Sequence, residues 1–269
     1  MLVFFQFSYI IIKNVDEAFT FIATNYVRSK CLQAGSSCRE IPCDTITIKA
    51  GVHTLRRKAD LLVMKQLIYL DNAATTKTRP EVVEAMLPYF TEYYGNPSSV
   101  YEFSAEPKRA IAQARETIAK ALGAKSNEIY FTYGGTESDN WALISTAEAY
   151  QAKGKHIITT KIEHHAILHT CEYLEQRGFE VTYLDVDEFG VVKLDELEKA
   201  IRPDTILISV MFANNEIGTI EPIKEIGEIA KKHGILFHTD AVQAFCHVPI
   251  NVDECHIDML SSSAHKLNG

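Results

Sequence analysis

The chain has 269 residues, of which 46% are hydrophobic and 23% are charged, and its formal net charge is −8. This composition is typical of a globular protein with one large or two ordinary domains. The acidic balance offers no basic face for nucleic acid and no polybasic membrane anchor, so neither partner is expected. The six cysteines include no Cys-x-x-Cys pair, which argues against a metal site and favours free thiols in a reducing cytoplasm.

The first 63 residues are interpreted as a small α/β extension whose role the sequence does not reveal. Residues 2–12 form a strongly apolar run that lacks the basic start and the cleavage site of a signal peptide. The run is also too short to span a bilayer, which needs about 20 apolar residues. We therefore predict a buried strand here, followed by a helix over about 16–33.

From Leu67 onward, strand-like and helix-like segments alternate, which is the pattern of a sheet covered by helices on both faces. The run 205–212 is continuously apolar, as in a central parallel strand. We therefore predict an α/β domain with an open, mostly parallel central sheet. The expected strands are 128–132, 155–160, 181–184, 205–212 and 234–238, and the expected helices are 138–150, 166–177 and one that ends at Gly234.

Polar residues follow several of these strands, at the place where ligands collect in parallel sheets. Gly134, Gly135 and Thr136 follow strand 128–132, and backbone N–H groups at such a helix start can cradle a phosphate. A glycine turn with a threonine helix cap explains the same residues equally well. Asp240 and Gln243 follow strand 234–238 and could face a ring nitrogen and a ring oxygen, although Asp240 could simply cap a helix.

The other strand ends add a histidine, an asparagine and a lysine. His164 follows strand 155–160 and Asn215 follows strand 205–212, where a packing histidine or turn chemistry would be ordinary interpretations. Lys266, close to Ser263 and His265, could equally be a surface lysine. Each signal alone is weak, but a phosphate cradle, an imidazole, an amide, an acid and a lysine together are what pyridoxal 5′-phosphate requires.

Residues 67–269 resemble the cysteine desulfurases, which are pyridoxal-phosphate enzymes of the class V aminotransferase family with the aspartate-aminotransferase fold (fold type I). The resemblance implies that residues 64–269 form the large cofactor-binding domain. The segments that carry it occur in one order along the chain: YLDNAATT (69–76), GNPSS (95–99), GGTES (134–138), EH (163–164), NNEIG (214–218), HTDAVQ (238–243) and SAHK (263–266).

The resemblance also implies roles for residues at these positions. Gly135, Thr136, Ser263 and His265 would bind the phosphate, and Lys266 would bond covalently to the cofactor.

Four further residues would contact the ring or the substrate. His164 would stack on the ring and handle protons, and Asn215 would contact the ring oxygen side and the substrate carboxylate. Asp240 would keep the ring nitrogen protonated, and Gln243 would hydrogen-bond the phenolic oxygen.

The implied activity removes sulfur from L-cysteine, leaving L-alanine and an enzyme persulfide for iron–sulfur cluster or thio-cofactor assembly. The resemblance implies a cytoplasmic homodimer with a sulfur-acceptor or scaffold protein as partner. It places the nucleophilic cysteine and a substrate-binding arginine well beyond Lys266, so we expect this chain to hold roughly the first half of such an enzyme. A selenocysteine lyase, another class V relative and an inactive truncated chain remain as alternatives.

Overall fold

The computed structural model describes residues 8–12 and 68–269 of the chain. The helix expected over 16–33 and most of the expected N-terminal extension lie outside the described residues. Of the apolar run 2–12, residues 8–12 are described, and they form a strand.

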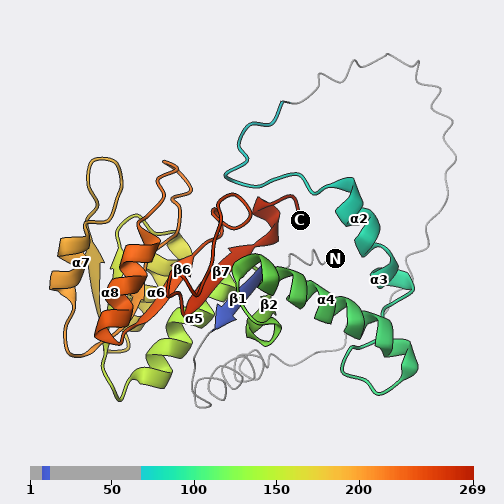
Figure 1. Ribbon diagram of the computed structural model, residues 1–269, viewed down its shortest axis with the longest axis horizontal. Coiled ribbons are helices and arrows are strands. Elements are labelled where there is room, and N and C mark those ends of the chain that lie inside the picture. Colours follow the sequence, from blue (N-terminus) through green and yellow to red (C-terminus); the bar gives the residue numbers. More distant parts are fainter. Residues whose placement is uncertain (1–7, 13–67) are drawn as a thin grey trace, which may run out of the picture.

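A seven-stranded sheet forms the centre of the structure, in the order β2-β1-β7-β6-β5-β3-β4 (Figure 1). Strands β3 to β7 pair in parallel, whereas β1 is antiparallel to both of its neighbours. All strands except β1 therefore run in one direction, which confirms the predicted mostly parallel sheet. The strands are β1 Ser8–Ile12, β2 Ile129–Thr132, β3 His156–Thr160, β4 Glu180–Leu184, β5 Thr205–Ser209, β6 Leu236–Asp240 and β7 Met259–Ser263.

Helices cover both faces of this sheet, while α2 and α3 lie away from it and bury no side chain (Figure 1). In the part of the chain that the structure describes, none of the helices is long and apolar enough to cross a membrane. The helices are α2 Pro80–Met86, α3 Pro88–Thr91, α4 Ala105–Leu122, α5 Gly135–Tyr150, α6 His165–Glu175, α7 Leu194–Ala200 and α8 Ile223–His233.

The hydrophobic core is divided by the sheet into two layers. Leu207 of β5 packs into the layer beneath α5 and α6, whereas the next residue, Ile208, packs into the layer beneath α4, α7 and α8. Ile157 and Ile158 of β3 divide in the same way. Because successive side chains of a strand point to opposite faces, a strand buried on both faces favours apolar residues at successive positions, and this explains the apolar run at β5.

The predicted elements of the sheet are present, with three boundaries corrected. Gly234 has a φ of 65° and ends α8, so β6 begins at Leu236 rather than at residue 234. Strand β6 ends at Asp240 rather than at residue 238, so Asp240 is the last residue of the strand. Strand β5 ends at Ser209 rather than at residue 212, although the N–H groups of Val210 and Phe212 still bond to the carbonyls of His238 and Asp240 in β6.

Strand β1 lies between β2 and β7 and pairs with both of them. Ile10 pairs with Tyr130 of β2 on one side and with Ser261 of β7 on the other. Both neighbours lead directly into site motifs, because Gly135 follows β2 and Lys266 follows β7. The sequence interpretation assigned residues 8–12 to a separate extension, whereas the structure places them within the main sheet.

A proline at position 10 tests this placement. Because β1 has a neighbour on each side, the N–H of Ile10 faces a paired strand, and proline removes that donor and adds a ring clash. We expect Ile10→Pro to lower the free energy of unfolding by roughly 3 kcal/mol in urea denaturation. Ile10→Val, which keeps the backbone donor, is the control, and equal midpoints for the two variants would contradict the pairing.

Candidate active site

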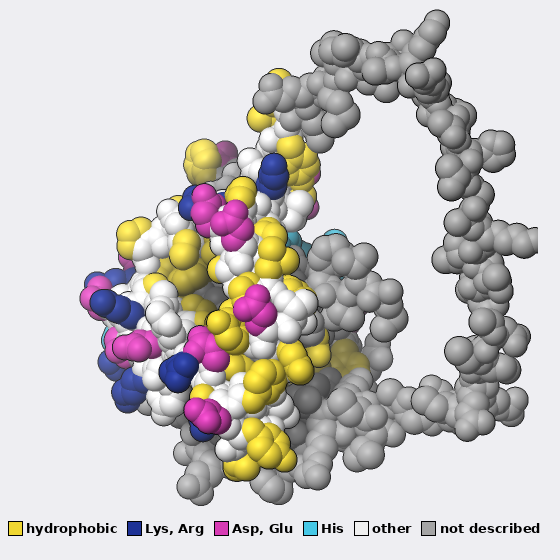
Figure 2. All heavy atoms as spheres, turned by 90° about the vertical axis from the view of Figure 1, so that its right-hand side faces the viewer, with side chains coloured by type: hydrophobic (Ala, Val, Ile, Leu, Met, Phe, Trp, Pro, Cys, Tyr) yellow, Lys and Arg dark blue, Asp and Glu magenta, His cyan; other side chains and the backbone are white. Residues whose placement is uncertain are grey.

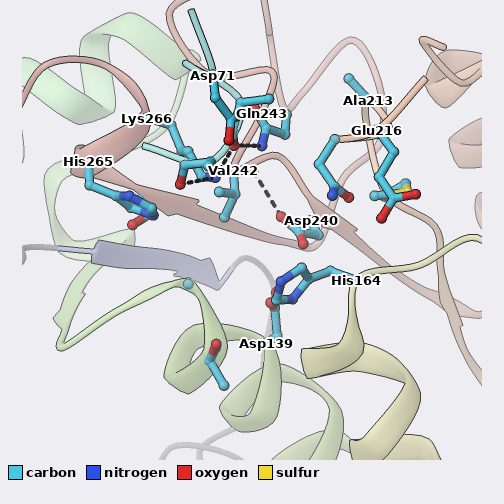
Figure 3. Close-up of a pocket in the computed structure, with 17 residues that line it drawn as sticks. Asp71, Asp139, His164, Ala213, Glu216, Asp240, Val242, Gln243, His265 and Lys266 are labelled. Carbon is cyan, nitrogen blue, oxygen red and sulfur yellow. Dashed lines mark hydrogen bonds between the residues drawn. The ribbon is translucent and has the colours of Figure 1, made fainter. Parts of the chain in front are cut away.

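A cavity of about 590 Å³ opens at the carboxyl ends of the strands, and all nine residues predicted for the site line it (Figure 3). Parallel strands bring their carboxyl ends to one edge of the sheet, so residues far apart in sequence meet there. The predicted residues at the cavity are Gly135, Thr136, His164, Asn215, Asp240, Gln243, Ser263, His265 and Lys266. Their roles in binding and chemistry remain predictions.

The glycine pair after β2 forms the start of α5 at one side of the cavity. Gly134 is the N-cap residue and Gly135 is the first residue of the helix, so a threonine cap is the wrong interpretation of this turn. A Cβ atom on Gly135 would lie 2.8 Å from Cγ2 of Val242, whereas one on Gly134 would meet nothing within 4 Å. A glycine at position 135 therefore allows α5 to approach the turn after β6 this closely. The first N–H groups of a helix have no partner within the helix, so they can bind an anion.

His164 is the N-cap residue of α6, and its imidazole reaches the cavity. Its Nδ1 atom accepts a hydrogen bond of 3.1 Å from the N–H of Ala166. A ring nitrogen that accepts carries no proton, so the neutral ring has its proton on Nε2. His164 therefore both caps a helix and presents an N–H donor.

The loop that carries His164 is fixed by the buried carboxyl of Glu163. Oε1 of Glu163 accepts hydrogen bonds from the Thr160 hydroxyl at 2.8 Å and from the Met211 N–H at 2.9 Å. These bonds tie the end of β3 to the end of β5. Burial raises the pKa of Glu163 to about 8, against the lowering effect of the two donors.

Asp240 lies at the end of β6 with only 6% of its surface exposed. Its Oδ1 accepts a hydrogen bond of 2.9 Å from the N–H of Val242, so Asp240 caps a turn. The alternative interpretation, in which Asp240 caps a helix, is wrong. Burial raises the pKa of Asp240, while the hydrogen bond from Val242 and the nearby His164 and Lys266 lower it.

Lys266 reaches the cavity from the turn that follows β7. Its Nζ donates to the carbonyl oxygens of Ala73 and Ala74, the latter at 3.0 Å (Figure 3). Partial burial lowers the pKa of Lys266, and the carboxylates of Asp240 and Asp71 act in the opposite direction. A lowered pKa increases the neutral fraction of the amine, which is the form that can attack an aldehyde.

The segment 71–79 contributes Asp71, Ala73 and Ala74 to the lining of the cavity, and sequence reasoning assigned no role to its residues. Gln243 donates from Nε2 to the carbonyl of Ala73 at 3.0 Å, and the N–H of Thr76 bonds to the carbonyl of His265 at 2.8 Å. The segment therefore holds both the amide and the lysine turn in place. The signal in the sequence was only the motif 69–76 itself, because long-range carbonyl contacts leave no periodic pattern.

Two further positions show what the sequence alone could not separate. Asn214 accepts hydrogen bonds at its Oδ1 from the N–H groups of Glu216 and Ile217, so it provides the turn chemistry, whereas Asn215 lines the cavity. Asp139 also lines the cavity and was missed. Its signal was its spacing, because it lies four residues after Gly135 and so shares one helix face with the glycine cradle.

The aminotransferase class-V family matches residues 68–269. The chain belongs to this family. Class V aminotransferases, including the cysteine desulfurases, are pyridoxal-phosphate enzymes. Membership of the family therefore confirms the predicted cofactor. The match includes every predicted site residue.

Relatives of the chain are cysteine desulfurases. The chain is 66% identical over 202 residues to cysteine desulfurase IscS of Methanosarcina thermophila, covering 75% of this chain and 50% of the relative. It is 62% identical over 206 residues to cysteine desulfurase IscS of Clostridium botulinum (strain Kyoto / Type A2), covering 77% and 52%. The chain thus spans about half the length of the curated relatives it matches.

Solved structures of this class V group share the fold type I architecture. SspA in complex with cysteine has a TM-score of 0.74 at 45% identity, covering 76% of this chain and 58% of that one. A NifS-like protein has a TM-score of 0.73 at 45% identity, covering 75% and 56%. The predicted fold class is confirmed by these matches.

A methyl group at position 135 tests the glycine cradle. We expect Gly135→Ala to push on Val242, destabilise the protein by about 1–3 kcal/mol in thermal unfolding and weaken pyridoxal-phosphate binding in absorbance titrations. Gly134→Ala, whose added methyl meets open space, is the matched control. When Val242 is already replaced by Ala, adding Gly135→Ala should cost much less stability than it does in the unaltered chain. An equal loss of stability in both backgrounds would contradict this contact.

Replacing Asp240 tests its field at the lysine. Because the Asp240 carboxylate raises the pKa of Lys266, Asp240→Asn should lower that pKa, and the reactive neutral amine should then appear at lower pH. The measurement is the pH dependence of reductive methylation of Lys266, followed by mass spectrometry. Asp195→Asn, which removes a surface carboxylate paired with Lys199, should leave the midpoint unchanged. A midpoint that stays constant or rises in Asp240→Asn would argue against this interaction.

Proposed function

We propose that this chain provides the cofactor site of a cysteine desulfurase, which removes sulfur from L-cysteine and releases L-alanine. The sulfur passes as a persulfide to an acceptor for iron–sulfur cluster or thio-cofactor assembly. The observation that carries the proposal is that the amine of Lys266 and the buried carboxyl of Asp240 line one cavity beside the glycine cradle at Gly135. The identity of 61–66% to cysteine desulfurases supports the choice of reaction within the family.

The residues at the cavity suit pyridoxal phosphate in chemistry and in space. Gly135 allows the start of α5 to pack closely against Val242, and the N–H groups of such a helix start stabilise a phosphate. Thr136, Ser263 and His265 add polar groups on the same side, and we assign these residues to phosphate binding. When bound, the cofactor withdraws electrons from the Cα atom of a linked amino acid.

The remaining residues would act on the ring and on protons. Asp240 is buried and would pair with a protonated ring nitrogen, since a carboxylate stabilises a nearby cation in a low-dielectric site. His164 presents its Nε2 proton to the cavity, and Gln243 is held by its bond to Ala73. We assign proton handling to His164 and Lys266, a phenolic-oxygen contact to Gln243, and substrate-carboxylate binding to Asn215.

We also propose a homodimer, with a sulfur-acceptor or scaffold protein as partner and a cytoplasmic location. An exposed apolar surface supports an association between protein chains, because contiguous apolar patches on a surface mark interaction sites. Figure 2 shows hydrophobic side chains exposed on the side of the molecule that carries α2 and α4. The large exposed side chains of this region are Leu87, Tyr89, Phe90, Tyr93, Tyr94, Val100, Tyr101 and Phe103.

Borohydride reduction tests the assignment of the lysine. The chain is mixed with pyridoxal phosphate, reduced with borohydride and digested, and the modified peptide is identified by mass spectrometry. We expect Lys266 to be the main labelled residue in the unaltered chain and this label to be lost in Lys266→Ala, because the groups of the cavity hold the aldehyde next to this amine. Lys161→Ala, which removes a lysine with 55% side-chain exposure, is the control.

The label decides cofactor binding, and a separate assay decides the reaction. Label on surface lysines alone would reject the site. If Lys266 is labelled, release of alanine from L-cysteine is measured with a thiol acceptor present, and L-selenocysteine is tested in parallel. Preference for selenocysteine would replace the desulfurase proposal with a selenocysteine lyase.

A further inference from the structure

A buried network of polar side chains lies beside the cavity, and none of its members belongs to the nine predicted site residues. His238 of β6 is fully buried, with Nδ1 lying 2.9 Å from the Ser209 hydroxyl and Nε2 lying 3.0 Å from the Ser261 hydroxyl. Ser261 in turn hydrogen-bonds the carboxyl of Asp139. The network therefore connects Ser209 of β5, through side chains of β6 and β7, to Asp139 of α5, which lines the cavity.

Asp139 is buried without a charge partner. It is 1% exposed, its Oδ1 has no hydrogen-bond partner, and in the described part of the chain no lysine or arginine forms an ion pair with it. Nε2 of His238 lies 3.7 Å from Oδ1 of Asp139. Burial lowers the pKa of His238 to about 3, so this imidazole is neutral and cannot balance an anion. An ionised Asp139 would be an isolated buried charge, which is strongly unfavourable.

The groups around Asp139 add to this cost. Asp240 at the end of β6 and Glu163 in the loop after β3 are acidic neighbours, and Ser261 of β7 is the one group that favours the ionised form. Burial first, and Asp240 second, raise the pKa of Asp139 well above its usual range.

Asp240 has the better environment for a negative charge. It accepts the Val242 N–H, and it lies close enough to His164 and Lys266 for both to stabilise its ionised form. In Figure 3, Asp240 and His164 lie between Lys266 on one side and Asp139 on the other. Two buried carboxyls that interact do not both ionise readily, and the proton remains on the one with fewer donors and cations.

We propose that Asp139 is a positioning residue that holds a proton at neutral pH, so that the single negative charge at this side of the cavity belongs to Asp240. This deepens the proposed function, on which it rests for what the charge on Asp240 does. The neutral Asp139 keeps its hydrogen bond to Ser261 and occupies the space beneath Asp240 without competing for a cationic ring nitrogen. Asp139 acts through Asp240 and does not itself touch the reacting atoms.

Infrared spectroscopy tests the proton directly and needs no cofactor. The chain is labelled with carbon-13 aspartate, and the isotope-sensitive carbonyl stretch of a protonated aspartic acid is sought at neutral pH. Among the described aspartates only Asp139 and Asp240 are buried, so others in this part of the chain are ionised in water. We expect the band in the unaltered chain and in Asp240→Asn, and its loss in Asp139→Asn.

The titration of Lys266 provides a second readout. Asn has the shape and neutrality of a protonated Asp, so Asp139→Asn should leave the midpoint of Lys266 methylation unchanged and the pyridoxal-phosphate affinity within about threefold. Asp240→Asn should lower both the midpoint and the affinity, the affinity by more than about tenfold. Circular dichroism and thermal unfolding check that both variants fold.

Two results would overturn the proposal. One is the absence of an isotope-sensitive acid band in the unaltered chain, and the other is a band lost in Asp240→Asn but kept in Asp139→Asn. If Asp139→Asn does not fold, the presence of the band in Asp240→Asn decides the matter alone. Failure of pyridoxal phosphate to bind the unaltered chain would reject the proposed function while leaving the infrared result valid.

Discussion

The parallel pairing of β6 with β7 is the constraint on which the site depends. Asp240 pairs with Ser261, so the carboxyl at the end of one strand and the lysine turn that follows the next strand open onto the same cavity. A displacement of this register by one residue would exchange the faces of all side chains on one strand. The buried side chains on both faces, such as Phe237 and Met259, make that displacement costly because it would break two core layers at once.

Three buried acidic side chains lie at or beside the cavity. Asp139, Glu163 and Asp240 come from three different elements and are all buried. Each solves the problem of burial differently. Glu163 accepts two hydrogen bonds that join neighbouring loops, Asp240 has a backbone donor with Lys266 and the His164 ring nearby, and Asp139 has a serine hydroxyl. A pocket built in this way can carry one well-placed negative charge, since repulsion and desolvation penalise a second.

Strand β1 adds a segment from outside the family match to this arrangement. It joins β2, which leads to the glycine cradle, with β7, which leads to the lysine. The glycine turn after β2 and the lysine turn after β7 are therefore held at a fixed spacing by a strand near the start of the chain. Stability of the sheet and geometry of the site are linked through these backbone hydrogen bonds.

The sequence by itself determined the element types and most of the site. The apolar run at β5 and the ending of α8 at Gly234 follow from local rules, because burial on both faces and a left-handed glycine leave direct marks in the sequence. The motifs at strand ends identified all nine predicted residues that line the cavity. Helices α2, α3, α4 and α7 and strand β7 were not predicted. Strand β7 and helix α7 are short runs of mixed polarity that have no clear period.

Only the tertiary structure decided how these residues divide their tasks. It showed that Asn214 builds the turn while Asn215 faces the cavity, that backbone carbonyls of Ala73 and Ala74 receive the lysine, and that Asp139 lies beneath Asp240. These contacts join positions up to 193 residues apart in the chain. Hydrogen bonding and burial at such separations depend on how the strands are paired, and no local pattern of residues encodes that pairing.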